Sequence, residues 1–249
     1  MSEICYKKNY IKQVIAKVDF AQPLADLTPE SLIAAVETIK KRFPISEQAT
    51  AFQQGIEITG EKIKSSKQEF PEWNFHGLDR DKSVKINQLF LQILLTKYKS
   101  EVDFKDDLIA PISQVMGSRP SALISRTGVR FINVFDFEIE SFRKVRDYFS
   151  ESISGHISSL PNPEVCIRSF LVNEFLIDNI KLRVQSGFFN PDYPAVIKRH
   201  HFVIDIDAYI DSPHQIKDVE GYFKEFHTKV QGLFESHITQ KLRDEVLNG

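Results

Sequence analysis

The chain has 249 residues, of which 42% are hydrophobic, and it can therefore bury a substantial core. This composition excludes intrinsic disorder, collagen-like repeats and small disulfide scaffolds. Lys and Arg (32) nearly balance Asp and Glu (34), so the chain lacks the basic excess of duplex-binding domains, and we expect no nucleic-acid partner. Twenty phenylalanines suggest a core of aromatic strands.

Neither a membrane segment nor a disulfide framework is predicted. No apolar run reaches membrane-spanning length, and residues 1–10 lack the apolar stretch of a secretory signal. The two cysteines, Cys5 and Cys166, show no Cys-x-x-Cys spacing and fit free thiols in a reducing compartment. We therefore expect a cytoplasmic protein without a membrane partner.

The first half of the chain alternates between strand and helix patterns. Residues 11–20 place alternate apolar side chains on one face and predict a strand. Thr28 and Pro29 then form an N-cap and first-turn pair, which predicts a helix over residues 29–42.

Three strands are predicted next, over residues 52–63, 72–78 and 84–98. The polar stretch from Glu61 to Glu69 is typical of an exposed hairpin arm or tip. Apolar spacing then predicts a helix from Phe104 onward that is bent near Pro111 and ended by Gly117.

The second half repeats this order. Residues 121–137 predict a strand, and the spacing of Ile139, Phe142, Val145 and Phe149 predicts a helix. Three further strands are expected, and a long amphipathic helix begins after Ser212 and Pro213. The three strands cover residues 165–177, 180–188 and 196–210.

Both halves thus show the order strand, helix, three strands, helix, which indicates an α+β fold with an internal structural duplication. Consecutive strands without helical crossovers require antiparallel pairing, so we expect antiparallel sheets packed with helices. The predicted lobes are residues 1–120 and 121–249, and no flexible linker separates them. We expect the lobes to pack as one compact unit.

The segment Arg126-Thr-Gly-Val-Arg-Phe-Ile-Asn133 follows the pattern Arg-x-Gly-x-Arg-aromatic-x-Asn. This pattern resembles the signature of a sporadically distributed family of uncharacterised prokaryotic proteins. Four further segments resemble the same family's landmarks, so the resemblance covers nearly the whole chain. They are the opening strand Tyr10–Phe20, the Trp73-x-Phe75 pair, the strand ending at Tyr98, and the terminal region with His227, Phe234-Glu235 and Ile238-Thr239. The family has no established activity, and the resemblance therefore implies a shared framework only.

Strand alternation puts Arg126, Gly128 and Arg130 on one face of the signature strand. Two guanidiniums that flank a glycine suit an anionic ligand, because the glycine permits close approach and each arginine can bind a phosphate or carboxylate. The alternative is structural: the arginines pair with carboxylates on a neighbouring strand, for which Asp205 and Asp207 are candidates. Asn133 lies on the opposite face and is expected to bind a backbone group.

The strand His201–Asp211 carries an acidic row that includes Asp205 and Asp207. Such a row could bind a divalent cation, but any half-exposed antiparallel strand shows the same pattern. We find no second ligand cluster with metal-site spacing, and no metal or cofactor is predicted.

The segment Ser186–Pro194 joins two predicted strands and contains Phe188, Phe189 and Tyr193. If exposed, these rings would form a rigid aromatic contact surface for a protein partner. Alternatively, they fold back and close the open end of a lobe.

Catalytic and cofactor motifs are absent from the sequence: there is no nucleophile elbow, phosphate-binding glycine loop, dinucleotide fingerprint or paired Cys/His spacing. We interpret the chain as a non-enzymatic binding or protein-interaction protein with no catalytic residues. The alternative is an enzyme or sensor that binds a phosphorylated small molecule through Arg126 and Arg130. Sheet edges and the long amphipathic helix are compatible with a homodimer.

Overall fold

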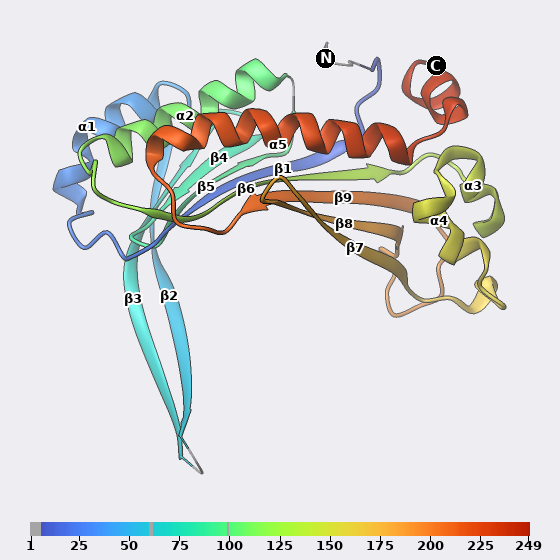
Figure 1. The fold of residues 1–249 in the computed structure, drawn as a ribbon, viewed down its shortest axis with the longest axis horizontal. Helices are drawn as coiled ribbons and strands as arrows, with labels where there is room; N and C mark the ends of the chain where they lie inside the picture. Colours follow the sequence, from blue (N-terminus) through green and yellow to red (C-terminus); the bar gives the residue numbers. More distant parts are fainter. Residues whose placement is uncertain (1–5, 60–61, 99) are drawn as a thin grey trace. The chain divides into compact units, whose positions relative to one another are not determined.

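The computed structural model describes residues 6–59, 62–98 and 100–249, and it combines helices with antiparallel strands as the predicted α+β class requires (Figure 1). The strands are β1 (Ile11–Phe20), β2 (Ile45–Thr59), β3 (Lys62–His76), β4 (Lys82–Ile86), β5 (Phe90–Leu95), β6 (Ile124–Phe135), β7 (Ser169–Ile177), β8 (Ile180–Phe189) and β9 (His201–Ile210). The α-helices are α1 (Pro29–Lys40), α2 (Glu101–Gly117), α3 (Val145–Tyr148), α4 (Glu151–Ser158) and α5 (Ile216–His237). Shorter helical segments are η1 (Phe142–Lys144), η2 (Pro163–Val165) and η3 (Leu242–Leu247).

The chain divides into two compact units, and each is assembled from separate segments. The first unit contains Met1–Val14, Gly128–Ile210 and Lys224–Gly249, whereas the second contains Ile15–Thr127 and Asp211–Phe223. The sequence predicts two consecutive lobes; in the structure, β1, β6 and α5 each contribute residues to both units.

In the second unit the strand order is β2-β3-β4-β5-β1-β6, and α1 packs against α2. The predicted N-cap forms, because Thr28 Oγ1 accepts a hydrogen bond from the Ser31 backbone N–H at 3.3 Å. Helix α2 has an N-cap that the sequence analysis did not identify: Ser100 Oγ accepts a hydrogen bond from the Asp103 backbone N–H at 3.1 Å. The predicted strand at residues 11–20 and the helices at residues 29–42 and 104–117 are therefore confirmed, with small differences at their ends.

The predicted strand over residues 84–98 is wrong, because this segment folds into the hairpin β4–β5. Asn87 causes the reversal: its buried side-chain Oδ1 accepts hydrogen bonds from the backbone N–H groups of Leu89 and Phe90, at 2.8 and 3.0 Å. Asn87 Nδ2 in turn donates to Glu72 Oε2 on β3 at 3.3 Å. An Asx turn of this kind competes with a continuing strand.

The predicted strands at residues 52–63 and 72–78 are parts of one long hairpin, β2–β3, whose register runs from Ile45 opposite His76 to Thr59 opposite Lys62. Figure 1 shows the hairpin extending away from the other strands of its unit. Residues 62–69 of the polar stretch lie in its outer part, as expected for a hairpin arm.

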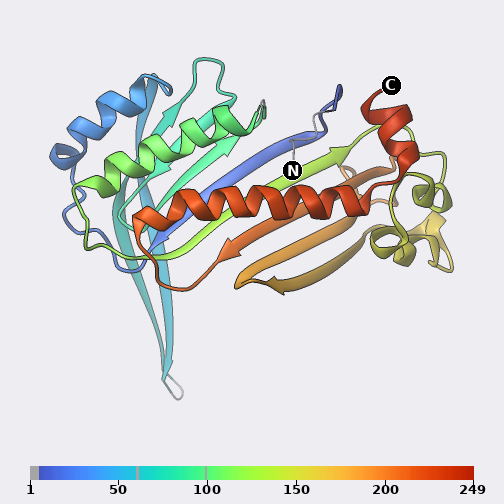
Figure 2. The same ribbon diagram turned by 45° about the horizontal axis from the view of Figure 1, so that its top comes forward.

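In the first unit the strand order is β1-β6-β9-β8-β7, and α4 packs beside β7 and β8. Its core is aromatic, as the phenylalanine content suggests: Phe149 stacks on Phe202 with ring centroids 4.1 Å apart, and Phe135 contacts Phe149 at 5.0 Å. Figure 2 shows β7 as the outermost strand of this unit.

The predicted helix through Ile139 and Phe149 is interrupted. Phe149 has extended backbone angles (φ -123°, ψ 142°) and forms an antiparallel bridge with Ile238, so the short helical segment η1–α3 ends before it and α4 begins after it. The buried ring of Phe149 in the aromatic core favours this arrangement over a continuous helix.

The pairs β2–β3, β3–β4, β4–β5, β7–β8 and β8–β9 are all antiparallel, as the absence of helical crossovers predicts. The two halves differ by one strand, because four strands separate α1 from α2 whereas three separate α4 from α5.

Candidate interaction edge

The arginines of the signature strand have separate surroundings. Arg130 forms a two-point ion pair with Asp205 of β9, with Nε to Oδ1 at 2.8 Å and Nη2 to Oδ2 at 2.5 Å. The Asp205 side chain is only 9% exposed, and its hydrogen bonds raise the pKa of the Arg130 guanidinium. Arg126 is half-buried and belongs to the second unit, whereas Gly128, which is buried, and Arg130 belong to the first.

Asn133 donates a hydrogen bond from Nδ2 to the carbonyl oxygen of Ile204 at 3.2 Å. This contact confirms the prediction that Asn133 ties a backbone group on the face opposite Arg130. The Arg130 guanidinium binds the Asp205 carboxylate through the same two-point geometry that an anionic ligand would use. An anionic ligand would therefore have to displace Asp205.

The three aromatic residues at the β8–β9 connection fall into two groups. Phe188 is fully buried and packs against Phe142 at 4.9 Å, so its ring belongs to the core. Phe189 and Tyr193 are 46% and 53% exposed, and the Arg168 guanidinium lies 4.2 Å from the Tyr193 ring centroid.

Asn190 places this connection next to the start of β7, because its Nδ2 donates to the carbonyl oxygen of Ile167 at 3.0 Å. The Ile197 backbone N–H also donates to the Cys166 carbonyl oxygen at 2.8 Å. The exposed rings of Phe189 and Tyr193 therefore lie near the beginning of β7.

Strand β7 has an unusually apolar sequence for an edge strand. Six of its nine residues are apolar, and four of these are well exposed: Val172 (45%), Phe175 (38%), Leu176 (69%) and Ile177 (42%). It ends the strand order of the first unit, with β8 as its neighbour. Long, exposed apolar edges of this kind are rare in proteins that do not pair them, since they favour association with another strand.

The features that normally protect an edge strand are weak here. The register from Ser169 opposite Phe188 to Ile177 opposite Ile180 has no bulge, and the strand contains no proline. Its one charged residue is Glu174, whose carboxylate lies 3.6 Å from Arg183 of β8. The edge is therefore open to a further strand.

The turn that follows β7 defines which backbone groups face outward. Asp178 and Asn179 both have positive φ (52° and 66°) and form a two-residue hairpin turn between the paired residues Ile177 and Ile180. In such a hairpin the flanking pair is hydrogen-bonded, and bonded and non-bonded pairs alternate along the ladder. The odd-numbered residues of β7 thus bond to β8, and the backbone groups of Phe170, Val172, Glu174 and Leu176 point away from it.

A hollow of about 200 Å³ opens beside this edge. Its walls combine the apolar side chains of Phe175, Leu176 and Leu182 with the charged side chains of Glu174 and Arg183. An apolar depression with a polar rim suits the side chain of an added peptide strand.

Asp107 on α2 is the centre of a second polar group, in the second unit. It is 4% exposed and accepts hydrogen bonds from Arg42 and from Lys82 Nζ, the latter at 2.9 Å. The hydrogen bond that Arg42 donates to the Asp107 carboxylate raises the pKa of Arg42. The adjoining cavity is only about 90 Å³, and the Asp107 carboxylate is paired with both Arg42 and Lys82, so we interpret the group as structural.

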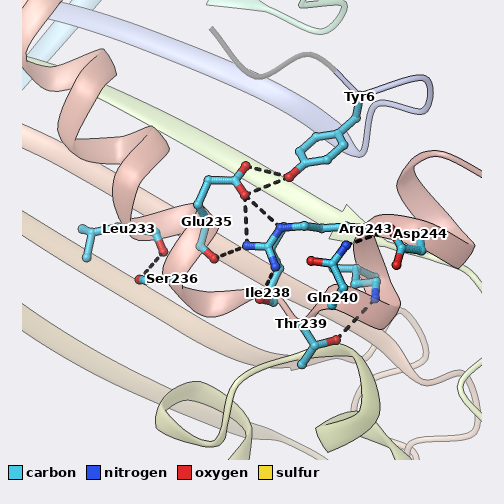
Figure 3. Close-up of polar contacts among 10 residues, drawn as sticks. Tyr6, Leu233, Glu235, Ser236, Ile238, Thr239, Gln240, Arg243 and Asp244 are labelled. Atoms are coloured by element: carbon cyan, nitrogen blue, oxygen red, sulfur yellow. Dashed lines mark hydrogen bonds and ion pairs between the residues drawn. The ribbon is translucent and has the colours of Figure 1, made fainter. Parts of the chain in front are cut away.

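A third polar group joins the segment before β1 to the end of α5 (Figure 3). The Tyr6 hydroxyl donates to the Glu235 carboxylate at 2.8 Å, and Arg243 Nη2 donates to the same carboxylate at 3.0 Å. Arg243 also donates to the Glu235 and Ile238 carbonyl oxygens and thereby caps the helix end. Burial, reinforced by Glu235, raises the pKa of Tyr6 to about 12.

Two histidines of the first unit, the half-buried His156 and the buried His237, have buried ring nitrogens without full hydrogen bonding. Neither ring nitrogen of His156 has a partner in the described part of the chain, and the same holds for Nε2 of His237. Burial lowers the pKa of both side chains.

Within residues 6–59, 62–98 and 100–249 we find no group of three His, Cys, Asp or Glu side chains arranged to hold a metal ion. In the acidic row of β9, Asp205 is held by Arg130. Among the described helices, none combines the length and the apolar character needed to cross a bilayer.

Comparison with known proteins yields no match, either in a scan against protein-family models or in a search of curated proteins. The exposed residues of β7 were not among the candidates from the sequence. The sequence did contain an indication of this surface. Strand β7 consists largely of two apolar runs, Phe170–Val172 and Phe175–Ile177, and such runs are typical of strands that are covered on both faces.

Proposed function

We propose that this protein is a non-enzymatic interaction protein that binds a protein chain by strand addition at the β7 edge. The observation that carries the proposal is the exposure of an unbroken, apolar edge strand whose outward backbone groups are available for pairing. Strand addition obtains affinity from backbone hydrogen bonds and specificity from alternate side chains. Phe189 and Tyr193, near the start of β7, would extend the contact surface.

The test uses a substitution that blocks the edge without disturbing β8. Val172→Pro removes an outward N–H and leaves the β7–β8 hydrogen bonds intact, since edge strands tolerate proline where the N–H faces solvent. Val102→Lys on α2 is the matched control, because Val102 is also well exposed (69%) but lies far from β7 in sequence and belongs to the other unit.

Affinity purification from extracts of the native cells, quantified by mass spectrometry, should recover proteins with the wild type and Val102→Lys that are lost with Val172→Pro. Circular dichroism checks that the proline variant is folded. Identical recovery with a folded Val172→Pro variant would contradict the proposal.

The alternative function, an enzyme or sensor for a phosphorylated small molecule, has less support because Arg130 is engaged by Asp205. Replacing Arg126 and Arg130 together by Gln tests it: thermal stabilisation by inorganic phosphate should disappear if the arginines bind anions. Stabilisation that persists in the double variant would remove this alternative.

Three further expectations belong to the same proposal. We infer an internal duplication from the similar order of elements in the two halves, a cytoplasmic location from the cysteine usage, and membership of the prokaryotic family from the Arg126–Asn133 pattern.

A further inference from the structure

We propose that the occupant of the β7 edge is β7 of a second copy of this chain, paired antiparallel with Asn173 on the twofold axis. This inference rests on the proposed function, because it assigns a partner to the same edge. A twofold interface uses the same surface on both copies, so the strand must be complementary to itself.

The backbone limits the registers that are available. Since Phe170, Val172, Glu174 and Leu176 present their N–H and C=O groups outward, each must pair with another even-numbered residue of the second copy. This condition holds whenever the twofold axis passes through a residue of β7, because an even-numbered residue then always lies opposite an even-numbered one. Centring it on Asn173 aligns all nine residues from Ser169 to Ile177.

The side chains favour this full-length register. Phe170 lies opposite Leu176 of the second copy and Leu171 lies opposite Phe175, so these pairs are apolar on both sides, whereas Val172 lies opposite Glu174 and Ser169 opposite Ile177. Immediately beyond the strand, Arg168 of one copy comes opposite Asp178 of the other. The Asp178 carboxylate already accepts a hydrogen bond from Lys229 Nζ of its own chain at 2.9 Å, and its remaining lone pairs can accept one from Arg168.

Registers centred on other residues of β7 give less favourable side-chain contacts or a shorter overlap. An axis through Glu174 places two carboxylates directly opposite each other, which is destabilising. An axis through Val172 or Leu171 shortens the overlap and leaves Leu176, the most exposed residue of the strand at 69%, without a partner strand.

Asn173 suits the axis position. Its side chain is half-buried and makes no hydrogen bond within the part of the chain that the structure describes. A primary amide both donates and accepts, so it can bond to its own symmetry copy, which a carboxylate or an ammonium group cannot do.

The first measurement is the mass of the purified full chain by light scattering after size-exclusion chromatography. We expect twice the monomer mass of 28.7 kDa for the wild type and for Val102→Lys, and the monomer mass for folded Val172→Pro. A wild-type monomer at the highest soluble concentration overturns the inference.

Cysteine cross-linking tests the register. Residues that face each other on the axis as a non-hydrogen-bonded pair have Cα atoms about 4.5 Å apart, within the range for a disulfide. With Cys5 and Cys166 replaced by Ser, mild oxidation should link Asn173→Cys dimers completely, whereas Leu171→Cys should remain unlinked. Linkage through Leu171→Cys, or a dimer that survives Val172→Pro, overturns the proposed pairing.

The two proposals fail in different ways. A wild-type monomer that nevertheless loses other bound proteins on Val172→Pro substitution would leave the edge as a site for a different partner. If neither self-association nor recovery of other proteins depends on Val172, the edge has no binding role and both proposals fail.

Discussion

The pair between Arg130 and Asp205 joins β6 to β9 and makes two charge-assisted hydrogen bonds. Because Asp205 is buried, Asp205→Ala should remove both of these hydrogen bonds from the partly exposed Arg130 guanidinium and leave it only the electrostatic interaction with Asp207. We expect the free energy of unfolding to fall by about 2 kcal/mol, within the range for hydrogen bonds to charged groups. Urea denaturation measures this loss.

The matched control for that substitution is Asp192→Ala, which breaks the pair with Arg199. Both of these side chains are about half exposed, and surface pairs contribute at most about 1 kcal/mol. Equal losses in the two variants would show that the Arg130–Asp205 pair is no more important for stability than an exposed one.

His156 and His237, whose unpaired ring nitrogens are buried, predict a dependence of stability on pH. Burial lowers the folded-state pKa of His156 and His237 below the ordinary value of 6.5, so the unfolded chain binds protons more readily than the folded one. Stability should therefore fall as pH drops through about 6.5, because protonation favours the unfolded state.

His156→Leu isolates one contribution, since neither ring nitrogen has a hydrogen-bond partner to lose in the described structure. Its urea midpoint should decrease less between pH 8 and pH 5 than that of the wild type. An unchanged pH dependence would rule out His156 as a contributor.

At the scale of elements, the pairing of β7 with β8 depends on Gly187. A Cβ atom placed there would lie 2.0 Å from the backbone oxygen of Ser169 and 2.8 Å from Cδ1 of Phe170, both on β7. Gly187→Ala must therefore push β7 away from β8. We expect a stability loss of more than about 2 kcal/mol, in the range of overpacking, together with loss of binding at the edge.

Gly232 on α5 offers the control, because a Cβ atom there meets nothing within 4 Å. Gly232→Ala should raise stability by up to about 1 kcal/mol, the usual gain from replacing a helical glycine. Thermal denaturation compares the two variants, and a Gly187→Ala protein as stable as the wild type would contradict the close-approach argument.

Helices and strands that are determined by residues close together in the sequence were predicted correctly. The helix that begins at Pro29 follows the capping residue Thr28, whose hydrogen bond forms as expected, and apolar spacing located the helix that begins at Glu101. The errors occur where a side chain finds a partner distant in sequence: Asn87 turns the chain while bound to Glu72, and Phe149 leaves the helix to pair with Ile238. Such partners do not influence local periodicity, so the sequence pattern continued through both positions.

At the scale of the whole molecule, self-association at β7 would link stability to protein concentration. A dimer that forms only from folded chains is stabilised by mass action. The melting temperature of the wild type should therefore rise with protein concentration, while that of Val172→Pro should stay constant. A wild-type melting temperature that is independent of concentration would contradict a folded dimer.

The division into units also belongs to this scale. Consecutive lobes were expected because the order of elements nearly repeats after residue 120. In the structure β1 and β6 are adjacent in the strand order, and each contributes residues to both units. A boundary at a single residue of the chain would not describe this division.

The α+β class, the antiparallel pairing of consecutive strands and most helix and strand positions follow from the amino-acid sequence, because capping, alternation and turn residues act over a few neighbours. It also identified Asn133 as a backbone-binding residue from strand parity alone. Three features depend on the three-dimensional packing: Arg130 pairs with Asp205, Phe188 is buried while Phe189 is exposed, and β7 is an open edge. Each of these depends on the order of strands in space, and strand order is set by packing between residues far apart in the chain.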